Sequence, residues 1–355
     1  MVPIEGTGSP ARVSTPNTPN SCSTNSVTGE TVCVANNTDI YLLTGTALTK
    51  TLTSSSDTTA GFSGGDCQNC GVAVNSTRNQ AVIQIGYSSA RSGSALQFLD
   101  LGHNALGTPV PANNEVSEDI LWDPFRNLIL SPDEGDNYDL FQVTTPLGVI
   151  PDSKTVTENS NQVSGVDGEF DSAGEDCSTG VALATDEGGS DLYVVNLDQV
   201  KFSSGTWSAP SQLQYFPEFS GLSAGPCPVA VAPGTTHLGI VSGEFGGATF
   251  AAIELPSSSV SGVPSVLDYA YATMPNTPDG DGFSNGYDPH TTTAYTSPNS
   301  GKAYGVMASW ASGEPAYVGV IDLKALLAAP RSGAHTVDPS YDLIKNNVVR
   351  YVATF

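Results

Sequence analysis

Basic residues are scarce in this sequence: 12 Lys and Arg stand against 36 Asp and Glu, and the formal net charge is −24 at pH 7. A protein of this charge repels phosphate backbones, so nucleic acid is excluded as a partner. Charged residues of both signs make up only 14% of the chain, well below the usual share of about a quarter. The acidic surplus suits cation binding or the solubility of an exported protein, and by itself it marks no site.

Long hydrophobic stretches are also missing, and none approaches the ~20 apolar residues that span a bilayer. The N-terminus lacks the basic and apolar regions of a signal peptide, and we expect that Met1 replaces a removed leader. Residues 1–29 are rich in Ser, Thr, Pro and Asn, which predicts a flexible lead-in before a single domain at 30–355. We expect a monomer that is extracellular, on the cell surface or in the periplasm.

Catalytic signatures are absent as well. The sequence contains no G-x-S-x-G elbow, no Walker loop, no H-E-x-x-H motif and no dinucleotide fingerprint after a strand. It has four histidines, of which His103, His237 and His335 fall on predicted turns or edges without a common partner and receive no role. Only His290 remains as a candidate base.

The six cysteines occur in a chain of extracellular composition, so we expect them to be oxidised. Cys22 and Cys33 flank a turn-like stretch and could close one hairpin. The pairing of the other four stays open, because six cysteines allow fifteen connectivities. The alternative, a zinc or redox half-site at Cys67 and Cys70, lacks a second CxxC and a nearby histidine pair.

A short apolar strand recurs six times along the chain and usually ends in an acidic or amide residue followed by Leu. The copies are IYLL (40–43), LQFLDL (96–101), LFQV (140–143), LYVVNL (192–197), FAAIEL (250–255) and YVGVIDL (317–323). Their ends are 42 to 68 residues apart, and such a period predicts a propeller of four-stranded blades. We therefore expect an all-β fold, a six-bladed β-propeller, with a β-sandwich as the alternative.

Further β-rich runs precede these copies. Second strands are expected at 31–35, 81–86, 128–131, 180–185, 237–243 and 304–309, and innermost strands at 71–74, 119–123, 168–172, 228–232 and 291–296. The first blade has no evident innermost strand. We propose that the C-terminal run 347–355 closes the ring beside it, with residues 9–20 as the alternative. The one predicted helix covers 323–329, with Asp322 as its N-cap.

Acidic residues gather where the repeat predicts one face of the propeller, at the starts of the innermost strands. Carboxylates that converge without basic partners repel one another, and a calcium ion with six to eight oxygen ligands removes that repulsion. The segment 279–288 (DGDGFSNGYD) alternates oxygen ligands with Gly as a calcium loop does, although an ordinary Asp-Gly turn is equally consistent with it. The predicted metal ligands are Glu118, Asp66, Asp167, Glu169, Asp279, Asp281 and Asp288.

Two short motifs carry a family resemblance. Glu118 to Asp123, followed by Pro124, resembles the E-x-x-x-W-D signature of the senescence-marker-protein/gluconolactonase propellers, and residues 278–280 resemble a P-D-G motif of that family and of NHL-type propellers. The resemblance implies that Glu118 is a calcium ligand and that the 279–288 loop lies near the same axial site. Glu118 falls in the third blade rather than the first, and the family's remaining Asn and Asp ligands have no counterpart that we can place.

Two classes of function remain open. In the first, a secreted or surface-tethered module recognises a small molecule, a glycan or a cationic partner on the acidic face, and calcium makes its loops rigid. In the second, a calcium-dependent hydrolase of lactones or esters uses the metal to polarise a carbonyl, and His290 activates water. The second reading requires Glu118, Asp288 and His290 to converge on the axis.

Overall fold

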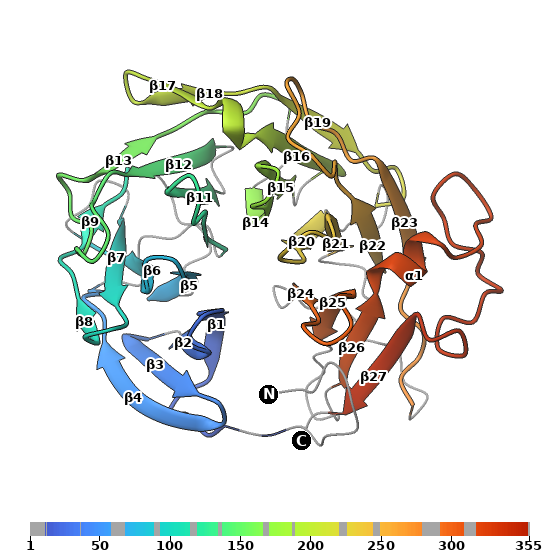
Figure 1. Ribbon diagram of the computed structural model, residues 1–355, viewed down its shortest axis with the longest axis horizontal. Helices are drawn as coiled ribbons and strands as arrows, with labels where there is room; N and C mark the ends of the chain where they lie inside the picture. The colour runs from blue at the N-terminus through green and yellow to red at the C-terminus, as the bar shows by residue number, and fades with distance from the viewer. Residues whose placement is uncertain are drawn as a thin grey trace.

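Six antiparallel sheets, five of four strands and one of five, are arranged as blades around a central axis in the computed structural model (Figure 1). The structure describes residues 11, 13–35, 37–57, 68–88, 93–113, 119–133, 137–165, 170–186, 189–219, 226–243, 249–278, 292–308 and 317–353. Each blade is built from one contiguous stretch of chain, with its strands in sequence order from the axis outward. The ring confirms the predicted six-bladed propeller and excludes the sandwich.

The first three blades contain β1 to β13. The first comprises β1 (Pro19–Thr24), β2 (Glu30–Ala35), β3 (Asp39–Thr44) and β4 (Ala47–Thr53). The second comprises β5 (Asn69–Asn75), β6 (Gln80–Gly86) and β7 (Ser94–Asp100), with an outer strand split into β8 (Ala105–Leu106) and β9 (Val110–Pro111). The third comprises β10 (Leu121–Trp122), β11 (Leu128–Asp133), β12 (Asn137–Val143) and β13 (Val156–Asn159).

The last three blades contain the remaining elements. The fourth comprises β14 (Phe170–Asp176), β15 (Val181–Asp186), β16 (Asp191–Asn196) and β19 (Ser211–Tyr215), with a 3-10 turn η1 (Leu197–Gln199) and a side hairpin of β17 (Lys201–Ser203) and β18 (Thr206–Ser208). The fifth comprises β20 (Pro226–Val231), β21 (Leu238–Gly243), β22 (Thr249–Glu254) and β23 (Asp268–Thr273). The sixth comprises β24 (Thr293–Thr296), β25 (Ala303–Ala308), β26 (Tyr317–Asp322) and β27 (Val349–Ala353), with α1 (Leu323–Leu327) after β26.

The predicted strands agree with these blades except at the two ends of the ring. The C-terminal run was predicted to pair beside the first blade, which is wrong: β27 is the outermost strand of the sixth blade and pairs with β26. The innermost strand of the first blade is β1, so that blade begins inside the range assigned to the lead-in. The predicted N-cap of α1 is confirmed, since the Asp322 carboxylate accepts a hydrogen bond from the Ala325 backbone N–H at 3.0 Å.

In the second to fifth blades, both faces pack against neighbouring blades, which explains why the middle strands read as continuous apolar runs. Every residue of β6, β15 and β21 is buried. Five hydrophobic clusters each combine side chains from two consecutive blades, from the first and second through to the fifth and sixth. The core is therefore a series of layers between blades rather than one central mass.

A turn of one design joins the first strand of a blade to its second in five of the six blades. Its first residue, Asn25, Asn75, Asp123, Asp176 or Ser297, accepts backbone N–H hydrogen bonds from residues two or three positions later. Its fifth residue, Gly29, Asn79, Asn127, Gly180 or Gly301, has a positive φ between 53° and 74°. Gly and Asn tolerate this left-handed conformation best, so the sequence specifies the turn at both ends.

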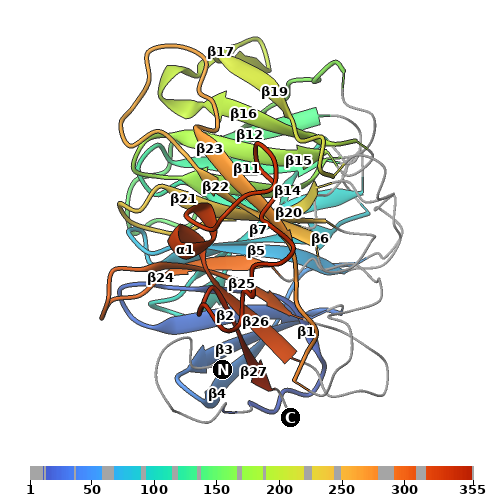
Figure 2. The ribbon, with the colours of Figure 1, turned by 90° about the vertical axis from the view of Figure 1, so that its right-hand side faces the viewer.

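Connections between the third and fourth strands reach back to the preceding blade. In the third blade, Pro146 O and Val149 O accept hydrogen bonds from Arg78 and Gln80 of the second. We call a connection that contacts the preceding blade in this way a clasp. The other three clasps are the β17–β18 hairpin, which contacts the third blade, residues 260–264, which contact the fourth, and residues 335–337, which contact the fifth. Figure 2 shows the ring from the side. In the sequence, α1 follows β26 and precedes this last clasp. Each of these clasps ties a blade to the one that precedes it in sequence.

Candidate binding surface around the axis

An axial cavity of about 790 Å³ lies between the six innermost strands. Small side chains of β5, β14 and β20, among them Ala73, Ala173 and Ala230, keep it open. Gly174 shows how closely the strands approach, because a Cβ atom there would lie 3.3 Å from the Val229 side chain. The cavity extends from the ends where the innermost strands start, which we call the start face, to the five-residue turns, which we call the turn face.

The wall of the axial cavity is more polar on the side of the first and last blades than on the side of the second and fifth. The first and last blades contribute Asn20, Ser21, Ser23 and Thr293, whereas the second and fifth contribute mainly Val and Ala. Two of these serines also hold β1 against the second blade: Ser21 Oγ accepts the Val72 N–H at 3.3 Å, and Ser23 Oγ accepts the Val74 N–H at 3.0 Å. Ser172 acts in the same way between β14 and β20, accepting the Val229 N–H at 3.0 Å.

All of the sequence-predicted site residues lie outside the described residues. They are His290 and the predicted calcium ligands Glu118, Asp66, Asp167, Glu169, Asp279, Asp281 and Asp288. All eight residues precede an innermost strand in the sequence, and Glu169 directly precedes β14, so the described strands fix where the stretches that carry these residues end. Among the residues that the structure does describe, no group of three or more His, Cys, Asp or Glu is placed to hold a metal.

Trp122 and Asp123, the W and D of the E-x-x-x-W-D motif, have structural roles. Trp122 is 5% exposed and packs edge-on against Phe98, with 5.5 Å between ring centroids. The Arg78 guanidinium lies 5.7 Å from the Trp122 ring centroid. Asp123 is fully buried and caps the turn that follows β10. These two residues therefore join the second and third blades and cap a turn, whatever Glu118 does.

On the turn face, a buried charge cluster that the sequence analysis missed joins the third and fourth blades. Arg126 donates to Asp123 Oδ2 at 2.9 Å, to the Cys177 carbonyl at 3.1 Å and to Asp198 Oδ1 at 2.7 Å. Burial acts to lower the pKa of Arg126, but the carboxylates of Asp123 and Asp198 outweigh it and raise that pKa. Arg126 Nη1 also lies 3.6 Å from Glu175 Oε1, so one cation serves three carboxyl groups.

Glu175 and Cys177 lie beside this cation. Burial, followed by the charge of Asp123, raises the pKa of Glu175 well above its usual value. Burial, followed by the charge of Glu175, likewise raises the pKa of the Cys177 thiol. A nucleophilic cysteine needs a lowered pKa. Cys177 therefore has a structural role, as a buried side chain packed between two blades.

The cysteine prediction holds in part. Cys22 and Cys33 form a disulfide, as the hairpin spacing suggested. Cys70 is also disulfide-bonded, to a partner outside the described side chains. Cys177 is a free thiol, so the expectation that all six cysteines are oxidised is wrong, because this side chain points into the Arg126 cluster.

The described histidines occupy the positions that the sequence analysis left without a role. His237 Nδ1 lies 2.7 Å from Asp176 Oδ2, linking the turns of the fourth and fifth blades. His103 Nδ1 lies 2.8 Å from Asp100 Oδ2 on the surface. His335 stacks on Tyr269 with ring centroids 3.7 Å apart. Each of the three contributes to a turn or a junction between blades.

No protein-family profile and no curated protein matches this chain. Solved structures do resemble its fold. The chain is similar to the β-propeller domain of Myceliophteria thermophila Cps50 (Swd1), with a TM-score of 0.55 and 8% identity over 86% of this chain and 84% of that one. It is also similar to the WD40 repeats of RRP9, with a TM-score of 0.56 and 8% identity over 88% of this chain and 81% of that one.

At 8% identity this likeness establishes the β-propeller fold and nothing about substrate or partner. The senescence-marker-protein/gluconolactonase resemblance therefore stays a prediction. Among the described residues, no helix has the length and apolar character required to cross a membrane.

Proposed function

We propose that this protein is a secreted or surface-tethered recognition module that binds its partner on the start face, around the opening of the axial cavity. The observation that carries the proposal is the agreement between topology and charge. Every innermost strand starts on the same face, and the axial cavity lies between these strands. The chemistry of that face is therefore set by the stretches of chain that lead to it.

The stretches that lead to five of the six innermost strands, β5, β10, β14, β20 and β24, carry acidic residues and no Lys or Arg, whereas Arg12 precedes β1. They comprise residues 54–68, 112–120, 160–169, 216–225 and 274–292. The turn face differs, because Arg78, Arg126 and Lys302 lie in or beside its five-residue turns. This asymmetry favours a cation or a cationic group at the start face.

Calcium is the cation that we propose, since carboxylate and amide oxygens are its preferred ligands. Its proposed ligands are the seven carboxylates predicted from sequence. The bound ion would neutralise part of the acidic face and orient the loops for a small molecule, a glycan or a cationic partner.

Calorimetric titration with calcium, together with thermal unfolding in calcium and in EDTA, tests this proposal. A site saturated at ~100 times its dissociation constant adds about 2.7 kcal/mol of stability. Asp281→Asn should weaken calcium binding at least tenfold, whereas Glu254→Gln should leave it unchanged, because Glu254 is an exposed residue at the turn-face end of β22. Absence of calcium binding in the unaltered protein would remove the metal from the proposal.

The recognition function is tested separately by screening glycans and cationic peptides in the presence and absence of calcium. Binding that Asp281→Asn weakens and Glu254→Gln preserves supports the start face as the binding surface. The alternative, a calcium-dependent lactone or ester hydrolase, rests on Glu118, Asp288 and His290 and stays a prediction. Turnover of a lactone series that His290→Ala abolishes would favour it over the recognition module.

A further inference from the structure

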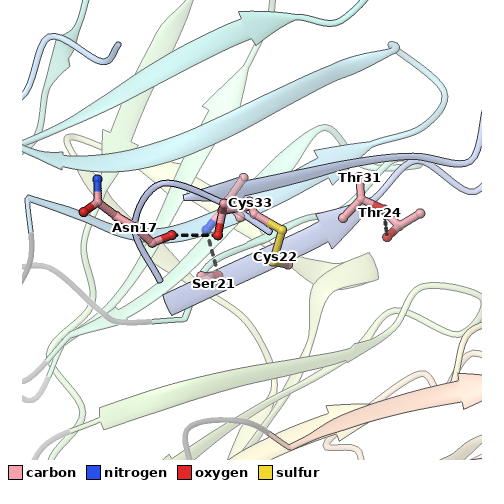
Figure 3. The surroundings of a disulfide bond; sticks show 8 residues. Asn17, Ser21, Cys22, Thr24, Thr31 and Cys33 are labelled. Carbon is pink, nitrogen blue, oxygen red and sulfur yellow. Dashed lines mark hydrogen bonds between the residues drawn. A yellow bond between two sulfur atoms is a disulfide. The ribbon is translucent and has the colours of Figure 1, made fainter. Parts of the chain in front are cut away.

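The junction between the last blade and the first is built differently from the other five. No hydrophobic cluster among the described residues combines side chains of these two blades. The face of the first blade that turns away from the second has a cluster of its own, consisting of Cys33, Ala35 and Tyr41. The segment before β1 lies against this face, since the Asn17 N–H donates to the Tyr41 hydroxyl at 3.0 Å. Figure 3 shows the surroundings of the Cys22–Cys33 disulfide, which joins β1 to β2.

Among the described residues, neither a shared strand nor a clasp joins these two blades. No strand is exchanged, because each of the two sheets is built from its own contiguous stretch of chain. A clasp like those of later blades requires a long connection between the third and fourth strands. In the first blade, β3 ends at Thr44 and β4 starts at Ala47, so only two residues connect them and cannot reach the sixth blade.

The strand at this junction is β1, and the Cys22–Cys33 disulfide holds it. β1 is the only innermost strand that no earlier blade precedes. It pairs with β2, and the two cysteines are directly opposite one another in that pairing. Its other described ties are side-chain hydrogen bonds, among them those of Ser21 and Ser23 to the second blade and that of Thr24 to Thr31 in β2. The disulfide is thus a covalent bond at the middle of an otherwise hydrogen-bonded strand.

The two cysteines of this bond differ in exposure. Cys22 is an exposed residue that lines the axial cavity, whereas Cys33 is 2% exposed. In a thiol–disulfide exchange on this bond, a thiolate that enters the cavity attacks the sulfur of the more exposed cysteine, Cys22, and Cys33 leaves as a thiolate. A second thiol resolves the mixed disulfide. The balanced reaction converts two small thiols and the protein disulfide into one small disulfide and two protein thiols.

We propose that β1 is a releasable wall of the axial cavity and that the Cys22–Cys33 disulfide is the latch, opened by small thiol reductants that enter the cavity. Reduction leaves β1 held by hydrogen bonds alone. The cavity then opens between the first and last blades, where no shared cluster of described side chains resists it. This inference concerns the cavity wall and stands whether or not the start face binds calcium.

The experiment compares the oxidised protein, the protein treated with dithiothreitol under native conditions, and the variant Cys22→Ser/Cys33→Ser. Alkylation and peptide mapping report which cysteines are reduced, and hydrogen exchange reports the opening of each strand. We expect alkylation of Cys22 and Cys33 and amide exchange in β1 at least tenfold faster, with β14 unchanged. The Cys177→Ser variant, which lacks the free thiol, should respond to dithiothreitol as the unaltered protein does.

Selectivity for reductant size provides the second readout. A protein reductant at the same thiol concentration should leave the Cys22–Cys33 bond intact, because it cannot enter the cavity. Three results would overturn the proposal: a disulfide that resists dithiothreitol while the protein stays folded, equal acceleration of exchange in β1 and β14, or equal reduction by small and protein thiols. If the double variant does not fold, the dithiothreitol-treated protein carries the test, and Cys70 is mapped in the same digest.

Discussion

The junction between the third and fourth blades and the junction between the sixth and first mark the two extremes of this ring. The former combines a hydrophobic cluster, three aromatic rings packed on Tyr138, a hairpin clasp and the buried Arg126 cluster. The latter has no shared cluster among the described side chains, and Asn17 and Tyr41 lie where such a cluster would be. A closed ring therefore does not require six equal junctions.

We therefore expect the stability of the propeller to be unevenly distributed among its blades. Local opening in a protein takes place where few apolar contacts must be broken. The third and fourth blades are expected to open last and β1 first.

Trp207→Ala should break the strong junction. Trp207 is 3% exposed, packs edge-on against Tyr138 and donates its indole N–H to the Tyr138 carbonyl at 2.7 Å. Losing a buried Trp side chain costs about 3–5 kcal/mol of unfolding free energy, measured by urea denaturation. Tyr215→Ala is the control, because Tyr215 is 55% exposed. A loss below ~1 kcal/mol for Trp207→Ala would mean that the hairpin does not hold this junction.

Asp139→Asn should strengthen the third blade, and the gain should grow with pH. Burial, followed by the charge of Asp133, raises the pKa of Asp139 to about 9. The unfolded chain ionises near its ordinary value of about 3.9, so folding takes up a proton between these limits. The contribution of Asp139 to stability is present below about pH 4 and falls as the pH rises towards 9, by at most about 1.4 kcal/mol per pH unit.

Urea denaturation of both proteins at pH 5 and pH 8 measures this effect. The neutral amide cannot ionise, so the variant should be more stable relative to the unaltered protein at pH 8 than at pH 5. Equal differences at the two pH values would show that Asp139 is ionised in the folded protein.

Tyr41→Phe should weaken the last-to-first junction slightly. The Tyr41 hydroxyl accepts from Asn17 and donates to Asp39 Oδ2 at 2.9 Å. Removing these hydrogen bonds costs about 1 kcal/mol, measured as faster hydrogen exchange in β2 and β3. A loss as large as that of Trp207→Ala would show that the two junctions contribute equally and would contradict the uneven distribution of stability.

The sequence repeat predicted the ring because each blade obeys the same local constraints. A run buried on both faces reads as continuously apolar, and the Asp or Asn plus Leu at its end marks where a middle strand reaches the turn face. The five-residue turns went unrecognised, although Asn-Ser-Val-Thr-Gly at 25–29 and Asp-Cys-Ser-Thr-Gly at 176–180 share one pattern. That pattern would have placed β1 directly before Asn25.

The errors arose where local pattern and long-range packing differ. The run that forms β27 has the same alternation whether it pairs with the first blade or the sixth, so only the tertiary register decides. Cys177 could not be recognised as a free thiol, because its environment consists of Arg126 and Asp123 from another blade. The predicted calcium ligands depend on convergence in space, which spacing along one chain does not determine.

The direction of the clasps has a consequence for biosynthesis. In every clasped junction the reaching segment belongs to the blade that leaves the ribosome later, as with Pro146 over the second blade and His335 over the fifth. Because domains fold from the N-terminus during synthesis, each new blade fastens the one made before it. Assembly in this order makes the first blade the foundation of the nascent ring, and the disulfide within it can form before any other blade has been translated.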